Sequence, residues 1–267
     1  LMEAVVIPSA NDACVAVAEH IGGSVENFVR KMNHLTTQLG LEDTYCVNVH
    51  GLDDTPDNDR NLTTAADLVD ITLALLEYPE ILEWSSIRYK PFRNGQFMLY
   101  NTNGLLGKYD GVDGLKTGYT DRAGSCLVAT ATRRDMRLVS VILGAQSERE
   151  RDEETRQLFD WAFSEFSKVN LAKKNELIAK ISVDWGLTPT VEARIADNSI
   201  AILNAQQEKS LNKKTTIPDI VEAPINKGAK LGNLQISIGD SLLFDVPIVA
   251  AESVGRMSWW EKLMSLF

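Results

Sequence analysis

The sequence predicts an α/β (α+β) domain that is incomplete at its N-terminus, then a small all-β domain and a C-terminal amphipathic helix. Two observations predict this order. Helical and strand periodicities alternate in blocks up to about residue 167, whereas short strand-like runs follow it. Charge changes at the same place, because residues 1–167 hold 26 acidic and 15 basic side chains and residues 168–267 hold 11 and 12. We therefore expect domains at 1–167 and 168–250, and a terminal helix at 251–267.

The first domain contains helical spacing and one strong hairpin signal. Apolar residues recur three or four positions apart in the early helices, and Gly40 is a plausible helix stop. Two β-rich runs joined by Arg133-Arg134-Asp135 predict a hairpin. The expected elements are helices at Asn11–Ile21, Val25–Leu39 and Thr63–Leu76, strands at Cys126–Thr132 and Met136–Gly144, and a helix at Glu148–Phe166.

The second domain is predicted from short alternating runs separated by turns, which favours a small β-sandwich or barrel-like fold. At the end of the chain, Met257, Trp260, Met264 and Phe267 share one face of a helix. A tryptophan-rich amphipathic helix suits a membrane surface, although docking on the protein body is the alternative. The expected strands are Glu176–Val183, Val191–Ala196, Ser199–Leu203, Lys214–Glu222, Leu234–Ile238 and Ser241–Val249.

Composition excludes several classes of protein. The net charge of −10 argues against a general nucleic-acid binder, so we expect no nucleic-acid partner. No uncharged apolar run is long enough to span a bilayer. Cys14, Cys46 and Cys126 lack metal-ligand spacing, so we expect buried free thiols, no metal and no cofactor. The chain opens at Leu1 in an apolar run, and we expect a fragment or processed form.

Ser9-Ala10-Asn11 stands where the first long helix begins. Ser9 and Asp12 fit a capping box, in which the serine caps the helix and the acidic side chain reaches back. The alternative is that Ser9 and Asn11 project into a cleft, where a hydroxyl relays a proton and an amide holds a substrate carbonyl. Both interpretations remain open at this point.

Lys116-Thr117-Gly118 follows a glycine-rich stretch at the start of a predicted strand. On an edge strand, Lys116 and Thr117 offer an ammonium and a hydroxyl to an anion, and Gly118 allows close approach to the backbone. An ordinary strand entry is the alternative, because the tripeptide alone is a weak signal.

The order Ser-x-Asn and then Lys-Thr-Gly occurs in β-lactamases and penicillin-binding proteins. Further segments extend the match along the chain. They are Pro8-Ser9-Ala10-Asn11-Asp12-Ala13, Phe28-Val29-x-x-Met32-Asn33, Leu39-Gly40-Leu41, His50-Gly51-Leu52-Asp53, and Gly114-Leu115-Lys116-Thr117-Gly118-Tyr119-Thr120 with Ala123-Gly124. With these segments the whole chain resembles the D-alanyl-D-alanine carboxypeptidases, which are low-molecular-mass penicillin-binding proteins of the bacterial envelope. The resemblance implies a transpeptidase-like fold for the first domain.

The resemblance also implies roles for individual residues. Ser9 relays a proton to the leaving amine, Asn11 bonds the substrate amide, and Lys116 holds Ser9 and raises the local positive potential. Thr117 binds the substrate's terminal carboxylate, beside Gly118. A backbone N–H near Tyr119 or Thr120 is one oxyanion donor; the family often has histidine where Tyr119 stands. Arg151 fits best as a second partner of the substrate carboxylate, and Arg149 fits next. The alternative is that these arginines are surface charges paired with Glu148 or Glu154.

One departure from the family pattern concerns the nucleophile. The family carries it, with a lysine base, in a Ser-x-x-Lys motif upstream of Ser-x-Asn, and only eight residues precede Ser9. The string Ser210-Leu211-Asn212-Lys213 follows Lys-Thr-Gly instead, so we interpret it as a coincidence. We therefore expect residues 1–267 to lack the nucleophile, to take no acyl group and to leave one face of the sheet uncovered.

The resulting hypothesis is a serine-type D-Ala-D-Ala carboxypeptidase that trims peptidoglycan pentapeptide stems and is acylated by β-lactams. It implies a periplasmic or extracytoplasmic protein, peripherally anchored to the membrane by the terminal helix. A non-catalytic penicillin-binding-like scaffold is one alternative. A serine β-lactamase is the other, disfavoured because no clear Glu-x-x-Leu-Asn segment lies between the motifs.

Overall fold

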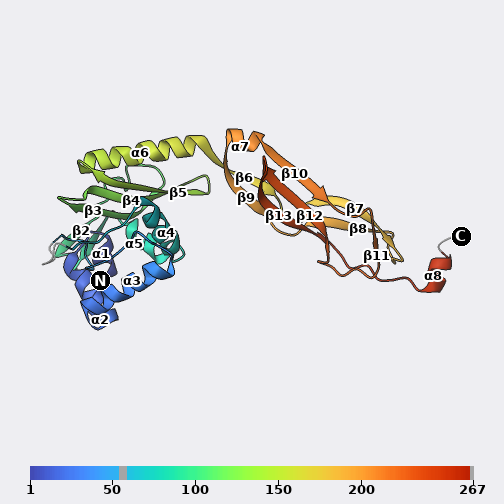
Figure 1. Cartoon of the computed structure of the whole chain (residues 1–267), viewed down its shortest axis with the longest axis horizontal. Helices are drawn as coiled ribbons and strands as arrows, with labels where there is room; N and C mark the ends of the chain where they lie inside the picture. The colour runs from blue at the N-terminus through green and yellow to red at the C-terminus, as the bar shows by residue number, and fades with distance from the viewer. Residues whose placement is uncertain (54–58, 265–267) are drawn as a thin grey trace. The chain divides into compact units, whose positions relative to one another are not determined.

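The computed structural model describes residues 1–53 and 59–264, which divide into two compact units, Leu1–Ser164 and Glu165–Phe267 (Figure 1). The first unit is mixed α/β and the second consists mostly of strands, as the sequence predicts. The helices of the first unit are α1 (Met2–Val6), α2 (Asn11–Gly22), α3 (Val25–Gln38), α4 (Ala65–Leu75), α5 (Glu80–Ser85) and α6 (Glu148–Glu165). Its strands are β1 (Tyr89–Phe92), β2 (Phe97–Tyr100), β3 (Val112–Thr120), β4 (Gly124–Arg133) and β5 (Met136–Ala145).

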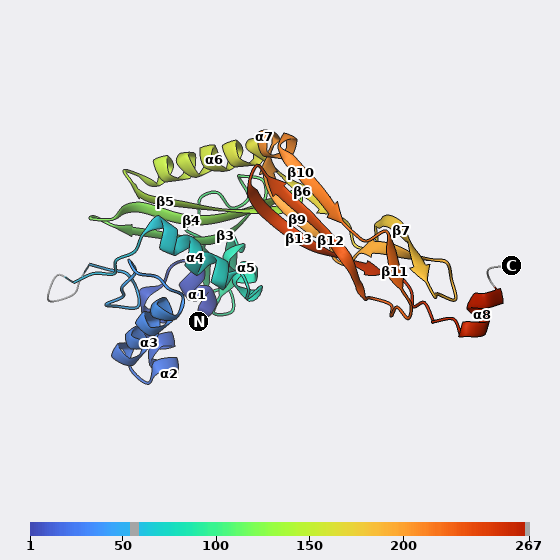
Figure 2. The ribbon, with the colours of Figure 1, turned by 45° about the vertical axis from the view of Figure 1, so that its right-hand side comes forward.

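A three-stranded antiparallel sheet, in the order β3-β4-β5, forms the centre of the first unit. Helix α6 covers one face of the sheet, while α4 and α5 lie on the other (Figures 1 and 2). Under α6, Phe159 is 1% exposed and stacks on Tyr109 with ring centroids 5.8 Å apart. Leu127 and Ala129 of β4 join the same buried cluster. Among the described strands, β3 is at the edge of this sheet. The buried cluster under α6 packs against one face of the sheet.

Local sequence explains the ends of the predicted elements. Ser24 accepts a hydrogen bond from the Asn27 N–H and caps α3, and Thr64 does the same for α4 from the Asp67 N–H. The β4–β5 hairpin turns at Arg134 and Asp135, whose positive φ angles of 51° and 57° fit a two-residue turn.

Three elements of this unit were not predicted. Helices α1 and α5 are too short to display a helical period. The third element is the β1–β2 hairpin, which pairs Tyr89 with Tyr100 and Phe92 with Phe97. The signal for it was present, because Asn94-Gly95 between two aromatic runs is a strong turn sequence.

The second unit packs a six-stranded sheet, in the order β10-β12-β13-β8-β7-β11, and the two-stranded β6-β9 ribbon around one apolar core. Period-two burial places Val191, Ala193 and Ile195 inward along β8. Its elements are β6 (Phe166–Ala172), β7 (Leu177–Asp184), β8 (Thr190–Ile195), β9 (Ser199–Asn204), α7 (Ala205–Lys209), β10 (Leu211–Thr216), β11 (Ile220–Glu222), β12 (Lys230–Ile238), β13 (Ser241–Ala250) and α8 (Trp259–Met264).

The single strand expected at Lys214–Glu222 is in fact two strands. Pro218 separates them, because its ring fixes φ and it has no N–H to donate to a ladder. Strand β10 pairs antiparallel with β12, whereas β11 pairs parallel with β7.

The helix predicted at 251–267 is much shorter in the structure. Residues before it form isolated β-bridges instead of helix, since Val254 bridges Ile225 and Arg256 bridges Gly186. Helix α8 starts at Trp259, after Ser258 exchanges hydrogen bonds with Glu261. Phe267 lies outside the described residues. Within the described part of the chain, no helix is long and apolar enough to cross a membrane.

Candidate active site

Ser9 and Lys116 meet in the structure although 107 positions separate them in the sequence. The Lys116 ammonium on β3 donates to Ser9 Oγ at 2.8 Å and to the Thr117 carbonyl at 2.9 Å. The structure excludes one of the two interpretations of Ser9. The expectation of a helix cap is wrong, because Ala10 is the N-cap of α2 and no side chain caps it.

The backbone around Ser9 explains why its side chain leaves the helix. Ser9 has φ 61°, in the left-handed region that few non-glycine residues adopt. The neighbouring Ala10 N–H donates to the Ala4 carbonyl at 2.9 Å, and Thr102 N–H donates to the carbonyl of the fully buried Ile7 at 3.2 Å. These bonds hold the turn between α1 and α2 in a strained conformation, which is typical of functional sites.

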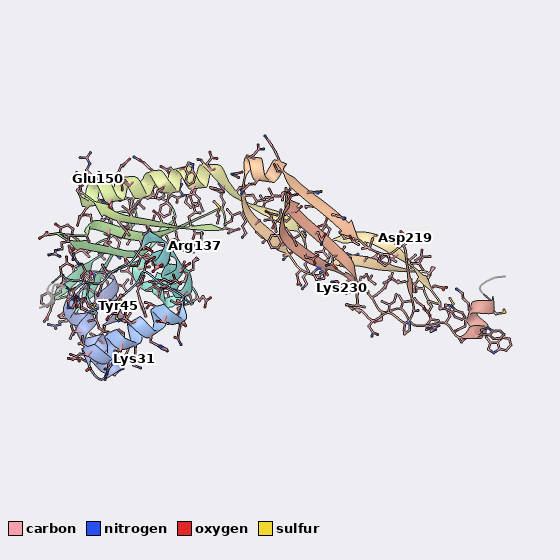
Figure 3. The ribbon with its side chains drawn as sticks, viewed as in Figure 1. Lys31, Tyr45, Arg137, Glu150, Asp219 and Lys230 are labelled. Carbon is pink, nitrogen blue, oxygen red and sulfur yellow. The ribbon has the colours of Figure 1, made fainter. Side chains whose placement is uncertain are left out.

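Strand β3 is positioned by polar side chains on both sides. Asp113 at its start accepts two hydrogen bonds from Arg137 on β5, at 2.9 and 2.8 Å, and one from Thr130 at 2.6 Å (Figure 3 labels Arg137). Ser85 donates to the Asp113 carbonyl, and the buried Asn103 amide donates to the Gly114 carbonyl at 3.0 Å. The position of Lys116 is therefore fixed through the backbone that precedes it.

Burial changes the acid–base properties of Lys116. Desolvation lowers its pKa from 10.5 to about 8, and the nearby Cys14 thiol acts weakly in the opposite direction. Burial also raises the pKa of Cys14. A lysine with a pKa near 8, hydrogen-bonded to a hydroxyl, can exchange a proton with it near neutral pH.

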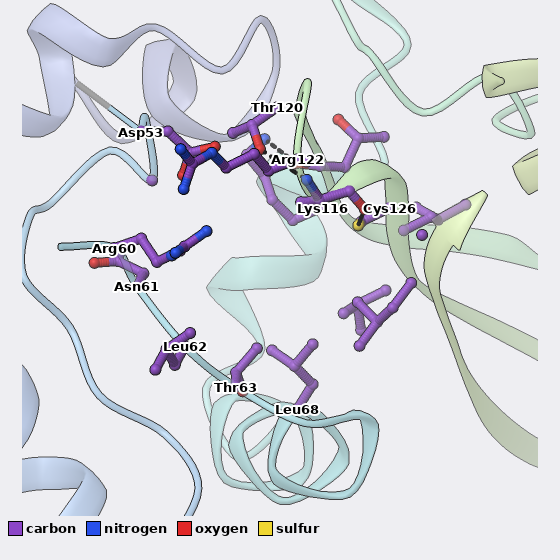
Figure 4. Close-up of a pocket in the computed structure, with 18 residues that line it drawn as sticks. Asp53, Arg60, Asn61, Leu62, Thr63, Leu68, Lys116, Thr120, Arg122 and Cys126 are labelled. Carbon is purple, nitrogen blue, oxygen red and sulfur yellow. Dashed lines mark hydrogen bonds between the residues drawn. The ribbon is translucent and has the colours of Figure 1, made fainter. Parts of the chain in front are cut away.

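Lys116, Thr117, Gly118 and Thr120 line a cavity of about 610 Å³, shown in Figure 4. The Thr117 hydroxyl lies 2.6 Å from that of Thr102, and no sequence pattern predicts this contact. A Cβ added to Gly118 would meet only Cys126 Cβ, at 3.8 Å. Packing within the described chain therefore does not require this glycine, and the space beside it belongs to the cavity.

The other predicted site residues lie differently. Asn11 is exposed on the first turn of α2, and Tyr119 is 63% exposed with its hydroxyl donating to Asp121 at 2.9 Å. This bond raises the pKa of Tyr119. None of Ser9, Asn11, Tyr119 and Arg151 is among the residues that line the cavity. Of the predicted set, only Lys116, Thr117, Gly118 and Thr120 line it, and Ser9 joins them through its hydrogen bond with Lys116.

Arg151 lies on α6 and is 2% exposed, and its guanidinium donates twice to Asp152, at 3.0 and 2.8 Å. The alternative of a surface charge paired with Glu148 or Glu154 is therefore wrong. A carboxylate of the chain itself satisfies this arginine.

Ser210 and Lys213 form no catalytic pair. Ser210 ends α7 and donates to the Gln206 carbonyl, whereas Lys213 lies on β10 and donates to the Leu171 carbonyl. Both lie in the second unit, away from any helix start of the kind that the Ser-x-x-Lys motif needs.

The serine–lysine pair beside a Lys-Thr-Gly strand, on a mixed α/β unit followed by an all-β unit, defines a penicillin-binding type of protein. The sequence comparisons agree. The family model of the D-alanyl-D-alanine carboxypeptidases matches residues 1–147, and that of the penicillin-binding protein 5 C-terminal domain matches residues 166–256. The chain belongs to the D-alanyl-D-alanine carboxypeptidase family.

Individual relatives cover nearly the whole chain. It is 35% identical to the D-alanyl-D-alanine carboxypeptidase DacF of Bacillus subtilis over 96% of its length and 66% of that protein. It is 33% identical to DacC of Escherichia coli over 100% of the chain and 67% of the relative. The chain thus spans about two thirds of the length of these curated relatives.

Solved structures share the fold. Penicillin-binding protein 5 of Haemophilus influenzae is 30% identical and superposes with a TM-score of 0.68, covering 95% of this chain and 73% of that one. PBP3 of Streptococcus pneumoniae, described as a peptidoglycan synthesis regulatory factor, is 26% identical with a TM-score of 0.75, covering 95% and 76%.

Proposed function

We propose that the protein is a serine-type D-Ala-D-Ala carboxypeptidase that removes the terminal D-alanine from peptidoglycan pentapeptide stems. The observation that carries this proposal is the hydrogen bond from Lys116 Nζ to Ser9 Oγ beside Thr117, in a chain of this family. The open edge of β3 offers an extended peptide a strand to pair with.

The proposed reaction is acyl transfer. A serine in a Ser-x-x-Lys segment outside residues 1–267 attacks the carbonyl between the two D-alanines, and its lysine accepts the proton. Ser9, coupled to Lys116, delivers a proton to the leaving amine, and water then releases the shortened stem from the serine ester. Penicillins acylate the same serine.

Substrate binding is assigned to the remaining residues. Thr117 and the Lys116 charge bind the terminal carboxylate, Asn11 bonds the substrate amide, and backbone N–H groups near Tyr119 or Thr120 stabilise the oxyanion. Arg151 is the proposed second partner of the carboxylate, and it has to exchange Asp152 for the substrate.

Release of D-alanine tests the proposal. The protein as its gene encodes it should hydrolyse an acetylated peptide ending in D-Ala-D-Ala and bind fluorescent penicillin covalently, whereas residues 1–267 alone should take no label. Lys116→Met should lower kcat/KM by about 10²–10⁴-fold, the range for a lost acid–base group. Arg134→Gln, in the exposed β4–β5 turn, is the matched control.

Two results would overturn the proposal. Penicillin labelling without D-alanine release from any peptide would leave a binding scaffold, and rapid repeated turnover of penicillin would indicate a β-lactamase. Full activity of Lys116→Met would remove the role assigned to the Ser9–Lys116 pair.

We also propose that the protein lies on the outer face of the cytoplasmic membrane, in contact through α8. Trp259 and Trp260 are 61% and 68% exposed, and Met264 is exposed beside them. Adjacent tryptophans suit the headgroup boundary. Trp259→Ser with Trp260→Ser should abolish cosedimentation with phosphatidylglycerol vesicles, and Tyr78→Ser, an exposed aromatic of the first unit, should leave it unchanged. Equal binding by both variants would refute this placement.

A further inference from the structure

Two arginines that belong to neither the Ser-x-Asn nor the Lys-Thr-Gly motif line the cavity beside Lys116. Arg122 follows the end of β3, and Arg60 precedes α4 on the opposite wall; Figure 4 shows both guanidinium groups directed at the space between the walls. Together with Lys116 they make three cations. Asp53 is the single carboxylate among the described lining residues.

This local charge is opposite to that of the surrounding unit. Residues 1–167 carry 26 acidic and 15 basic side chains, yet the cavity concentrates positive charge. Low-dielectric walls lined by one sign of charge focus the electrostatic potential and attract ligands of the other sign. The distribution therefore points to an anionic ligand.

Arg60 and Arg122 also lack the ion-pair partners that three other arginines of the first unit have. Arg133, Arg137 and Arg151 each form an ion pair with an aspartate. Among the residues that the structure describes, Arg60 and Arg122 make no ion pair or hydrogen bond; Arg60 is half-buried, whereas Arg122 is exposed at the cavity rim. Partial burial of an unpaired charge is unfavourable, so a site that keeps one is arranged for an external anion.

We propose that Arg60 and Arg122 bind an internal carboxylate of the stem peptide and make the enzyme prefer stems in which this group is free. The inference rests on the proposed function. Thr117 and Lys116 already serve the terminal carboxylate, so a second cationic pair further along the cavity requires a second anion on the same substrate. A guanidinium fork matches a carboxylate with two parallel hydrogen bonds, whereas a neutral amide offers a single acceptor and no charge.

Stem peptides carry such carboxylates before the D-alanines. One belongs to the γ-linked glutamate at the second position, and another to the third residue where that is a diamino dicarboxylic acid. Either can be converted to an amide. The two positions share the same chemistry, so the experiment has to distinguish them.

The test compares pentapeptides with free carboxylates, with an amide at position two, at position three, and at both. The protein as its gene encodes it should hydrolyse the free form about 10–100-fold better in kcat/KM than the form amidated at both, the range expected for a charged hydrogen bond of about 1.5–3 kcal/mol. The difference should lie mainly in KM and shrink as salt is added. The singly amidated peptide that shows the same loss in kcat/KM identifies the carboxylate that the two arginines bind.

The double variant Arg60→Gln with Arg122→Gln should bring the ratio of kcat/KM between the free peptide and the doubly amidated peptide close to one. Arg134→Gln should preserve that ratio. Circular dichroism checks that each variant is folded. Equal hydrolysis of all four peptides by the unaltered protein, or an unchanged ratio in the folded double variant, would overturn the inference and leave the proposed function intact. Absence of D-alanine release from every peptide would instead refute the proposed function.

Discussion

The two units bury different kinds of side chain. The second unit packs seventeen buried apolar residues into one cluster, from Leu171 to Val254. Of the twelve buried polar or charged residues in the described part of the chain, eleven lie in the first unit and only Ser199 lies in the second. A buried polar group is costly unless it is hydrogen-bonded, and most buried polar groups in proteins are. The Ser140 hydroxyl is an exception here, with no partner among the described residues. The first unit therefore depends on specific pairs, and the second on apolar alternation.

The difference extends to titratable groups. In the first unit, burial shifts the pKa of Lys116, Cys14 and Cys46. In the second, the lowered pKa values belong to surface carboxyls such as the exposed Asp184 and the partly exposed Glu192, which accept hydrogen bonds from basic neighbours. Groups whose pKa is shifted by burial are concentrated at functional sites, whereas exposed ion pairs contribute little to stability. The comparison is consistent with the proposed site in the first unit, where Lys116 lines the cavity, and it predicts that different substitutions destabilise the two units.

The largest expected effect comes from the apolar cores. Ile236 on β12 is fully buried, and Ile236→Ala should destabilise the second unit by about 2–5 kcal/mol. Phe159→Ala should destabilise the first by about 3–5 kcal/mol. Hydrogen exchange followed by mass spectrometry should show loss of protection in β12 and β13 for one variant, and in β3 to β5 for the other. Loss of protection in both units from either variant would contradict their independence.

Sequence patterns predicted the four longer helices of the first unit and most strands of the second unit. Alternation along β8 and helical spacing along α3 are local consequences of burying one face, and one sequence displays them. The Lys-Thr-Gly strand and Ser9 were found through motif order. The Ser9–Lys116 contact was expected only by resemblance, because the positive φ of Ser9 depends on bonds to distant backbone.

Other features of the site left no signal in the sequence. Arg60 and Arg122 belong to no periodic pattern, and only folding brings them to one cavity. Thr102 meets Thr117 through a loop contact that spacing does not encode. The predicted terminal helix was too long because an amphipathic pattern does not reveal that Val254 and Arg256 form isolated β-bridges with Ile225 and Gly186. Local rules fail where tertiary contacts decide the conformation.

The next effect is the pH dependence of stability due to Lys116. Its folded pKa of about 8 lies below the unfolded value of 10.5, so the folded state binds fewer protons between these values. Burial of the ammonium lowers the free energy of unfolding by its full amount below pH 8 and no longer lowers it above pH 10.5. The free energy of unfolding of the first unit should therefore rise with pH through this window, by up to about 3 kcal/mol at 1.36 kcal/mol per pKa unit.

Urea unfolding at pH 7.5 and pH 10, followed by circular dichroism at 222 nm, measures this effect, because helices α1 to α6 belong largely to the first unit. The quantity to compare is the difference between the unaltered chain and Lys116→Met, both in a Cys14→Ser background, because Cys14 interacts with Lys116 and its own titration would change with the substitution. If that difference stays constant from pH 7.5 to 10, the ammonium is not desolvated in the fold.

The smallest expected effect tests whether polar pairs stabilise the first unit as well as positioning β3. Arg137→Met leaves Asp113, which is 26% exposed, with Thr130 as its remaining side-chain donor. Loss of two charged hydrogen bonds at a partly exposed site should lower the free energy of unfolding by about 2 kcal/mol. Arg134→Met, in the exposed turn three positions earlier, should change it by less than about 0.5 kcal/mol.

Urea unfolding at 222 nm compares these two variants directly. Equal stability of both would mean that the Asp113–Arg137 pair positions β3 without stabilising the first unit. The expected difference would instead mean that Asp113 and Arg137 do both, because the same bonds that fix the start of β3 compensate for removing the two charges from water. Weakening them should then also disturb Lys116, three residues further along the strand, which slower penicillin labelling by Arg137→Met in the protein as its gene encodes it would reveal.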